Sequence, residues 1–379
     1  MIRHQHARAI FGGLGAVLLL AACSPGLPQS TATASGGGTS IETLLAPADS
    51  VRVDAKPGPP VVGPINHTAF SLPYAGFLPL PDGPVGDPNR QYTICFSQAD
   101  SVGSWAVAQR ESAMVEQARH PNLKVLYYNT NNDPLKQVAD VDSCLAQHVD
   151  AVVIWPHSVE PLTPEIEKVA QSGTVLVGME RTVATSDYSS WIYLDNVAAT
   201  KDLALAVGKS MGGKGTVVET DGAIGSSPQI LRRDGFVKAL NEAYPEITVD
   251  FTAPTDYSRN QGYKVALDYL QAHPGKKIGA WYSQFSEIGY GVHQALADYN
   301  QASSVPQYTI VDGRTADQAV AGGTFQALAP WNPLHGDLAI RAAIYHLTGK
   351  QVPKNLLLQQ PPLVTRQNAA EQLAATWVG

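Results

Sequence analysis

The 379-residue sequence has little cysteine and no pattern typical of a metal centre. Its three cysteines are Cys23, Cys95 and Cys144, and none of them forms a CxxC pair or has the Cys/His spacing of a zinc site. Lysine and arginine never form a run or a basic patch, and the formal net charge is −7. Nucleic acid is therefore not an expected partner, and no metal is expected.

The common motifs of enzymes are also missing. The stretch GKSMGGKGT (208–216) is similar to a phosphate-binding loop, but Leu203 stands where GxxxxGKS requires glycine. No GxGxxG follows the first expected strand, and DGAIGSSPQ (221–229) contains no GxSxG elbow. His157 lies beside Ser158 in the sequence, yet no oxyanion glycine or third partner accompanies them. The sequence argues against an enzyme, and no cofactor is expected.

The first 22 residues predict export. They contain Arg3, Arg8 and no acid, and an apolar stretch over residues 9–22 that is too short and too rich in glycine to span a membrane. The stretch ends in Leu-Ala-Ala-Cys23, which resembles the bacterial lipobox, whose cysteine is acylated. An ordinary secretory signal with a chance cysteine is the alternative. We expect a protein in the periplasm or on the cell surface, held to the membrane by a lipid on Cys23.

Residues 23–90 are rich in Pro, Gly, Ser and Thr, a composition that predicts a flexible tether. Within it, HTAFSLPYAGFLPLP (67–81) carries enough apolar residues to pack along a folded body. Beyond the tether, Cys95 falls in an expected strand and Cys144 on the apolar side of an expected helix. Export permits a disulfide between them, but two buried free thiols are the preferred interpretation.

From residue 91 the sequence alternates between apolar runs typical of strands and patterns typical of helices. The strand-like runs are 92–96, 123–128, 151–155, 174–179, 215–219, 247–251, 277–282 and 308–312, and most are separated by a helical pattern. Such alternation predicts βαβ units and parallel sheets covered on both faces. The region from residue 91 onward has around 290 residues, which is more than a single hydrophobic core usually contains. We therefore expect two α/β lobes with doubly wound sheets. Ligands of such sheets bind beyond the carboxyl ends of the strands.

Six stretches between about residues 91 and 365 follow one another in the order of a known family. They are FSQ…SW (96–105), AQHVDAVVIWP (146–156), VGMERT (177–182), YLDNVAAT (193–200), LRRDGFVKAL (231–240) and VDG (311–313). Together they resemble the type I periplasmic solute-binding proteins of bacterial sugar importers, and in particular the ribose- and galactofuranose-binding members. No helix-turn-helix precedes them, which separates the chain from the related repressors.

The resemblance implies a ligand site built by both lobes. A sugar has a weakly apolar C–H face, which suits aromatic rings, and a rim of hydroxyls, which suits planar charged groups. Trp105 matches a stacking position and Tyr257 an aromatic of the second lobe. Arg181, Arg232 and Asp312 match charged groups of the two lobes. Trp105 could instead fill the core as a core plug, but we favour a platform on which a ligand face stacks. The alternative for Arg181 and Arg232 is a pair of surface salt bridges.

Four positions depart from the family pattern. Glu180 stands where the family usually has Asp, and Trp155, Phe285 and Leu328 stand where relatives often have a polar side chain. A sugar hydroxyl buried without a partner costs about 1–3 kcal/mol. Plain ribose or glucose should therefore fit poorly. The site looks suited to a deoxy, methylated or aryl-bearing sugar, or to another partly apolar solute.

The resemblance also implies three crossings between the lobes, near Asp195-Asn196, Ala329-Pro330 and Gln351–Pro353. The N-terminal lobe would then comprise residues 91–195 and 330–353, and the C-terminal lobe residues 196–329 and 354–379. Ligand held between the lobes would stabilise a closed form that docks on the permease of an ABC transporter. A sensor kinase or chemoreceptor is the alternative partner. We expect a monomer that meets the membrane only through its lipid anchor.

Overall fold

The computed structural model describes residues 39–379 except 101–102, 312, 376 and 378–379, and the span from 39 onward forms one compact unit. The predicted signal peptide, Cys23 and the first part of the predicted tether lie outside the described residues. Within the described part of the chain, no helix is long and apolar enough to cross a membrane.

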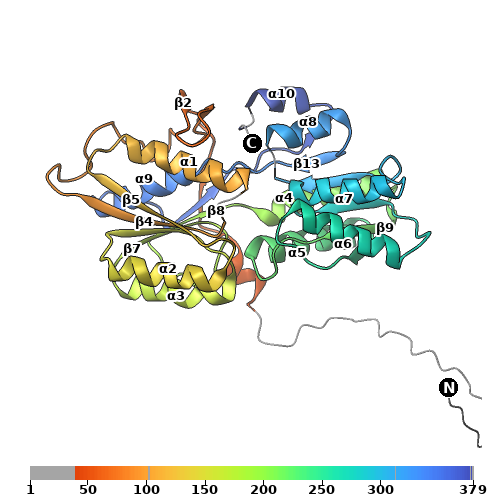
Figure 1. The fold of residues 1–379 in the computed structure, drawn as a ribbon, viewed down its shortest axis with the longest axis horizontal. Helices are drawn as coiled ribbons and strands as arrows, with labels where there is room; N and C mark the ends of the chain where they lie inside the picture. The colour runs from red at the N-terminus through yellow and green to blue at the C-terminus, as the bar shows by residue number, and fades with distance from the viewer. Residues whose placement is uncertain (1–38, 101–102, 312, 376, 378–379) are drawn as a thin grey trace, which may run out of the picture. The chain divides into compact units, whose positions relative to one another are not determined.

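The first lobe is built on a seven-stranded sheet in which every neighbouring pair is parallel. In spatial order its strands are β1 (Val51–Val53), β14 (Asn355–Leu358), β8 (Ser190–Tyr193), β7 (Val175–Glu180), β6 (Ala151–Trp155), β4 (Tyr92–Gln98) and β5 (Leu123–Asn129). Helices α1 (Ser104–Ala118) and α9 (Gly336–Leu347) cover one face, and α2 (Pro134–Ala146) and α3 (Val159–Gln171) cover the other (Figure 1). Side chains of β6 alternate between the two resulting cores, with Val153 in one and Val152 in the other.

The second lobe is built on a six-stranded sheet. In spatial order its strands are β10 (Glu246–Phe251), β9 (Lys214–Thr220), β11 (Ala280–Ser283), β12 (Gln307–Ile310), β13 (Ala327–Ala329) and β15 (Val364–Thr365), of which only β15 runs antiparallel to its neighbour. Helices α4 (Asn196–Ser210) and α5 (Ser227–Ala243) share one core, and α6 (Arg259–Ala272) and α7 (Ser286–Asp298) share another. The short helices α8 (Arg314–Gly322) and α10 (Ala369–Ala375) flank β15. The predicted α/β class with two parallel sheets is confirmed.

Three segments cross between the lobes. The first joins β8 to α4 and contains Asp195, whose carboxylate accepts a hydrogen bond from the Ala198 amide and caps the helix. The second joins β13 to α9 and begins at Pro330. The third lies between β14 and β15, so the predicted crossing at Gln351–Pro353, and the lobe boundary drawn after it, are wrong. The four-residue run 355–358 is too short to stand out as a strand in the sequence.

The predicted tether is wrong for residues 39–90, which belong to the folded unit. These residues form a 3-10 helix, η1 (Ile41–Leu44), strand β1 of the large sheet, and a hairpin of β2 (Pro60–Val62) and β3 (Ala69–Ser71). They bury Leu44, Val53, Leu72, Tyr74, Leu80 and Val85. As expected, the stretch 67–81 packs on the body. The polar backbone of this segment is satisfied by distant side chains, for example by Glu111, which accepts from the amides of Ile65 and Asn66.

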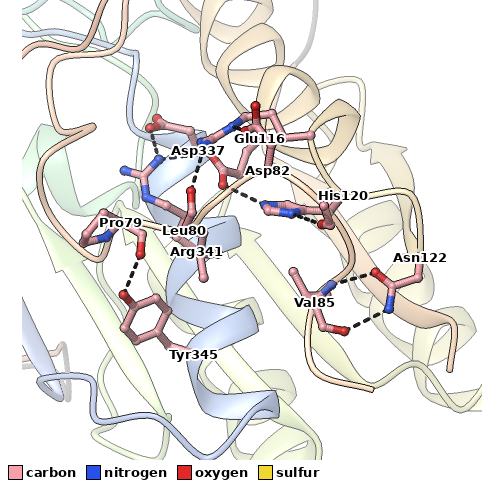
Figure 2. Close-up of polar contacts among 12 residues, drawn as sticks. Pro79, Leu80, Asp82, Val85, Glu116, His120, Asn122, Asp337, Arg341 and Tyr345 are labelled. Carbon is pink, nitrogen blue, oxygen red and sulfur yellow. Dashed lines mark hydrogen bonds and ion pairs between the residues drawn. The ribbon is translucent and has the colours of Figure 1, made fainter. Parts of the chain in front are cut away.

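Polar contacts fasten residues 79–85 to the first lobe, and a network of buried charges around Arg341 lies beside them (Figure 2). Arg341 of α9 is fully buried and pairs with Glu116 of α1 at 3.1 Å and with Asp337 at 2.6 Å. Its remaining NH group donates to the Tyr74 carbonyl at 2.9 Å. Buried charges are tolerated only when such partners surround them. The N-terminal segment therefore supplies one of the hydrogen-bond acceptors that allow Arg341 to be buried.

A disulfide joins Cys95 of β4 to Cys144 of α2, so the interpretation of two free thiols is wrong. Both cysteines are fully buried in the core between the sheet and α2, and their Cα atoms lie 6.0 Å apart, within the usual span of a bridge. The sequence placed Cys95 in a strand and Cys144 on the apolar side of a helix, and both placements are confirmed. It could not give the distance between the two elements.

We expect loss of this bridge to lower the free energy of unfolding by about 2–4 kcal/mol, because the bridge restrains the unfolded chain over a long loop. Urea unfolding of the wild type with and without a reductant measures this. The Cys95→Ala/Cys144→Ala double variant is the control and should respond equally in both conditions. Equal stability of the wild type before and after complete reduction, verified by thiol labelling, would contradict the expectation.

Candidate functional site

A cavity of about 520 Å³ lies beyond the carboxyl ends of the strands of both sheets. Its aromatic lining consists of Trp105, Trp155, Tyr257, Phe285 and Trp331, and its charged lining of Asp100, Glu180, Arg181, Arg232, Asp256, Arg259 and Glu287. Parallel strands bring the loops that follow them to one edge of a sheet. Two such edges therefore supply the walls of one cavity.

The predicted ligand-binding residues that the structure describes line this cavity, with the exception of Leu328. Trp105, Trp155, Glu180 and Arg181 come from the first lobe, and Arg232, Tyr257 and Phe285 from the second. Asp312 lies outside the described residues. Of the predicted hinge residues, Asn196 reaches the site indirectly, because its side-chain oxygen accepts a hydrogen bond from the Arg232 Nε at 2.8 Å.

Trp105 belongs both to the cavity wall and to the core of the first lobe. Only 7% of its surface is exposed, and its ring centroid lies 5.1 Å from that of Trp155 and 5.8 Å from that of His335. The indole therefore belongs to the core, the alternative that the sequence made less favoured, and it also faces the cavity. Trp105 is the second residue of α1, which begins near the end of the sheet. At this position its ring can face the cavity on one side and the core on the other.

A chain of buried polar groups holds the imidazole behind Trp105. The Asn332 carbonyl accepts from His335 Nδ1 at 3.1 Å, and the Gln109 amide donates to His335 Nε2 at 3.2 Å. Gln98 in turn donates to the Gln109 oxygen at 3.0 Å. Burial lowers the pKa of His335 to about 4. The ring is therefore neutral near pH 7 and serves as a fixed support for the indole.

Two arginines from opposite lobes are held in place by contacts that leave them little freedom. The Arg181 guanidinium lies 4.9 Å from the Trp155 ring centroid and 5.6 Å from that of Tyr257, and it donates to the His157 carbonyl at 2.5 Å. Arg232 also donates, through its NH1 group, to the Gln284 carbonyl at 2.7 Å. Arg181 is 5% and Arg232 3% exposed. This burial excludes the alternative of surface salt bridges.

Glu180 provides a buried carboxyl group near the arginines. One of its oxygens lies 3.5 Å from the Arg181 Nε. Burial raises the pKa of Glu180, while the nearby guanidinium groups of Arg181 and Arg232 act in the opposite direction. The site thus combines two fixed cations with a carboxyl group whose ionised form burial disfavours.

Three cavity residues also have strained backbones. Glu180, Tyr257 and Val311 have φ angles of 67°, 68° and 75°, which are uncommon for residues with a Cβ atom and least favourable for the branched valine. Such strain costs about 1–3 kcal/mol for each residue and persists where the surrounding structure enforces it, often at functional sites. Glu180 is the last residue of β7, Val311 directly follows β12, and Tyr257 lies between β10 and α6.

One predicted position was wrong and one important residue was missed. Leu328 does not line the cavity, because it is fully buried in β13 and packs in a second-lobe core with Phe325 and Val364. Trp331, three positions later, lines the cavity instead. The signal for Trp331 was an aromatic residue directly after Pro330 at an expected crossing.

Further charged residues of the lining were also absent from the prediction. Arg259 and Glu287 form a two-point ion pair, with N–O distances of 2.9 and 3.0 Å, and their side chains are 51% and 41% exposed. Each lies in the first turn of a second-lobe helix, α6 or α7. We place this pair at the mouth of the cavity, where solvent reaches it. No cluster of side chains suited to a metal ion is found in the described part of the chain.

Residues 94–351 match the sequence profile of a family described as the periplasmic binding protein domain. The chain is 25% identical over 265 residues to the xylitol-binding protein of Mycolicibacterium smegmatis, covering 69% of this chain and 74% of that protein. It is 26% identical over 292 residues to the galactofuranose-binding protein of Escherichia coli, covering 74% and 90%. Against the ribose import binding protein of Bacillus subtilis the identity is 25% over 269 residues, covering 70% and 85%.

Solved structures share the fold. An ABC transporter solute-binding protein from Mycobacterium smegmatis with bound glycerol matches with a TM-score of 0.69 and 28% identity, covering 76% of this chain and 99% of that one. The fructose-binding periplasmic domain of a hybrid two-component system matches with a TM-score of 0.70 and 24% identity, covering 75% and 94%.

The resemblance noted in the sequence and the prediction of a non-enzyme are both confirmed by these relatives. The chain belongs to the periplasmic binding protein domain family, whose members are exported solute-binding proteins rather than enzymes.

Proposed function

We propose that this protein is a lipid-anchored, extracytoplasmic solute-binding protein that captures a sugar or sugar-like molecule between its lobes and delivers it to the permease of an ABC importer. The observation that carries the proposal is the cavity beyond both sheets, in which Arg181 of one lobe and Arg232 of the other lie among aromatic rings. Relatives named as ribose-, xylitol- and galactofuranose-binding proteins support the ligand class.

The cavity chemistry suits a ligand with one apolar side. Guanidinium groups donate to pairs of hydroxyls, and aromatic rings pack against C–H groups. Trp155, Phe285 and Trp331 enlarge the apolar part of the lining. A deoxy, methylated or aryl-bearing sugar or polyol fits this lining better than a ligand with hydroxyls on every side, whose buried hydroxyls would lack partners.

The lobes contact each other directly beside the cavity. The Val159 amide donates to the Gly225 carbonyl at 2.9 Å, and the Thr182 amide donates to the Ser227 hydroxyl at 2.7 Å. A ligand that touches both lobes binds this arrangement better than an open one. It therefore shifts the equilibrium toward closure by its difference in affinity for the two states. The closed protein is the form that a permease would recognise.

A sensing role is the second candidate. It is favoured by the likeness in fold to the periplasmic domain of a hybrid two-component system. In that case the closed protein would contact a sensor kinase or chemoreceptor instead of a permease. Genes for a permease and an ATPase beside the gene for this protein would support import.

Replacing Cys23 tests the anchor. We expect Cys23→Ser to move the protein from the membrane fraction to the soluble fraction, because lipid on this cysteine is the proposed attachment and the described chain contains no membrane-spanning helix. Fractionation of cells expressing either form measures the change. A variant that stays with the membrane after a high-salt wash would contradict the lipoprotein proposal.

A thermal-shift screen of sugars, polyols and their deoxy, methyl and aryl derivatives tests the ligand class. A true ligand at 100 times its Kd should stabilise the protein by about 2.7 kcal/mol. We expect derivatives with an apolar substituent to give larger shifts than ribose, galactose or glucose. Calorimetry that shows sub-micromolar affinity for an unmodified pentose or hexose would contradict this expectation.

Trp105→Ala should reduce both ligand affinity and stability, because the ring lines the cavity and also fills the first-lobe core. Truncating a buried aromatic costs about 3–5 kcal/mol. Phe325→Ala is the matched control, since Phe325 is 1% exposed and packs in a second-lobe core away from the cavity. Calorimetry with the best molecule of the screen, and urea unfolding of both variants, separate the two effects. Equal affinities for the two variants would remove Trp105 from the ligand site.

A further inference from the structure

We propose that residues 39–53, here called the N-terminal strap, act as a clamp that holds the two lobes together independently of ligand. The strap comprises η1, strand β1 and the residues between them. In Figure 1 its red-orange ribbon lies where α3 of the first lobe approaches α5 of the second. The proposal concerns the closed arrangement itself and needs no assumption about which solute the cavity takes.

Leu44 is the apolar contact that bridges the lobes. Its side chain is fully buried and packs with Val159 of α3 and Leu231 of α5. Partly buried residues around this cluster come from the strap, from the first lobe and from the second lobe: Ile41, Ala184, Val197 and Ile230. Leu45, the next residue, is 37% exposed. The chain thus directs one leucine into the seam between the lobes and leaves its neighbour near solvent.

At the same place, hydrogen bonds of Thr182 connect the strap to the first lobe and the first lobe to the second. The Thr182 hydroxyl donates to the Leu44 carbonyl at 2.9 Å, while the Thr182 amide donates to Ser227 of α5. Thr182 directly follows Arg181, and Leu231 directly precedes Arg232. The seam filled by Leu44 is therefore one residue away from each cavity arginine.

The other end of the strap is attached at the hinge. Strand β1 pairs with β14 along Val51–Val53, and the Val53 carbonyl accepts from the Gln359 amide at 3.0 Å. Gln359 begins the third crossing, whose next residue, Gln360, donates to the Pro330 carbonyl of the second crossing at 3.1 Å. The strap thus runs from the crossings to the seam beside the cavity.

Opening the lobes would separate Val159 from Leu231 and expose Leu44 to water. The free energy of burying one leucine side chain corresponds to a factor of roughly ten to a hundred in an equilibrium constant. The strap should therefore shift the equilibrium between the closed and open lobes toward closure by about this factor. A strapped protein would bind its solute with a correspondingly smaller conformational cost.

Hydrogen exchange of the ligand-free protein tests the clamp, because the amides of Val159 and Thr182 both donate across the seam. We expect Leu44→Ala and Leu44→Asp to speed exchange of these two amides by roughly ten- to a hundredfold. Leu45→Asp, the matched control, should leave both rates unchanged. X-ray scattering of the same samples should show a larger radius of gyration for the Leu44 variants alone.

Several results would overturn the clamp. Rapid exchange at Val159 and Thr182 in the wild type would show that the strap does not hold the seam closed. Unchanged exchange in both Leu44 variants would show that Leu44 does not contribute. Equal acceleration at Val153, in the centre of the first sheet, would show that the strap stabilises the first lobe alone. Because no ligand is added, each of these failures would leave the proposed solute-binding function unaffected.

Discussion

The burial of charged groups from two lobes in one cavity is the constraint on which the rest of the structure depends. Arg181 of the first lobe stacks between Trp155 of its own lobe and Tyr257 of the other. Arg232 is fixed by Asn196 at the first crossing and by the Gln284 carbonyl. Charges so buried are stable only with partners on every side, and some of those partners exist only while the lobes are together. A ligand that supplies the remaining partners therefore acts on lobe closure as well as on the cavity.

The segment before the first long strand contributes more to this arrangement than its composition indicates. It adds β1 to the edge of the large sheet, supplies the Tyr74 carbonyl to the buried Arg341, and places Leu44 in the seam between the lobes. The same Pro- and Gly-rich stretch thus contacts the first lobe and, through Leu44, the seam between the two lobes. Such a chain has few local interactions of its own, so its order comes from the lobes that it touches.

The sequence was sufficient to predict the two parallel sheets, because strand–helix alternation is typical of βαβ units. The resemblance to a known family supplied seven of the residues that line the cavity, among them Trp105, Arg181 and Arg232. The sequence failed where a prediction needed a distance between elements. The Cys95–Cys144 bridge depends on the packing of α2 on β4, and the order of residues 39–90 depends on partners as distant as Glu111 and Arg341. Leu328 was misplaced because the resemblance matched it to a polar position of the family, whereas its side chain in the three-residue strand β13 faces a core.

The most direct test of the central claim is a crystal structure of the protein with the molecule that gives the largest thermal shift. The account predicts density for that molecule between the aromatic rings of the cavity, within hydrogen-bond distance of both Arg181 and Arg232. Density at another surface, or density in the cavity that contacts one lobe alone, would contradict the claim that the two lobes share a single ligand.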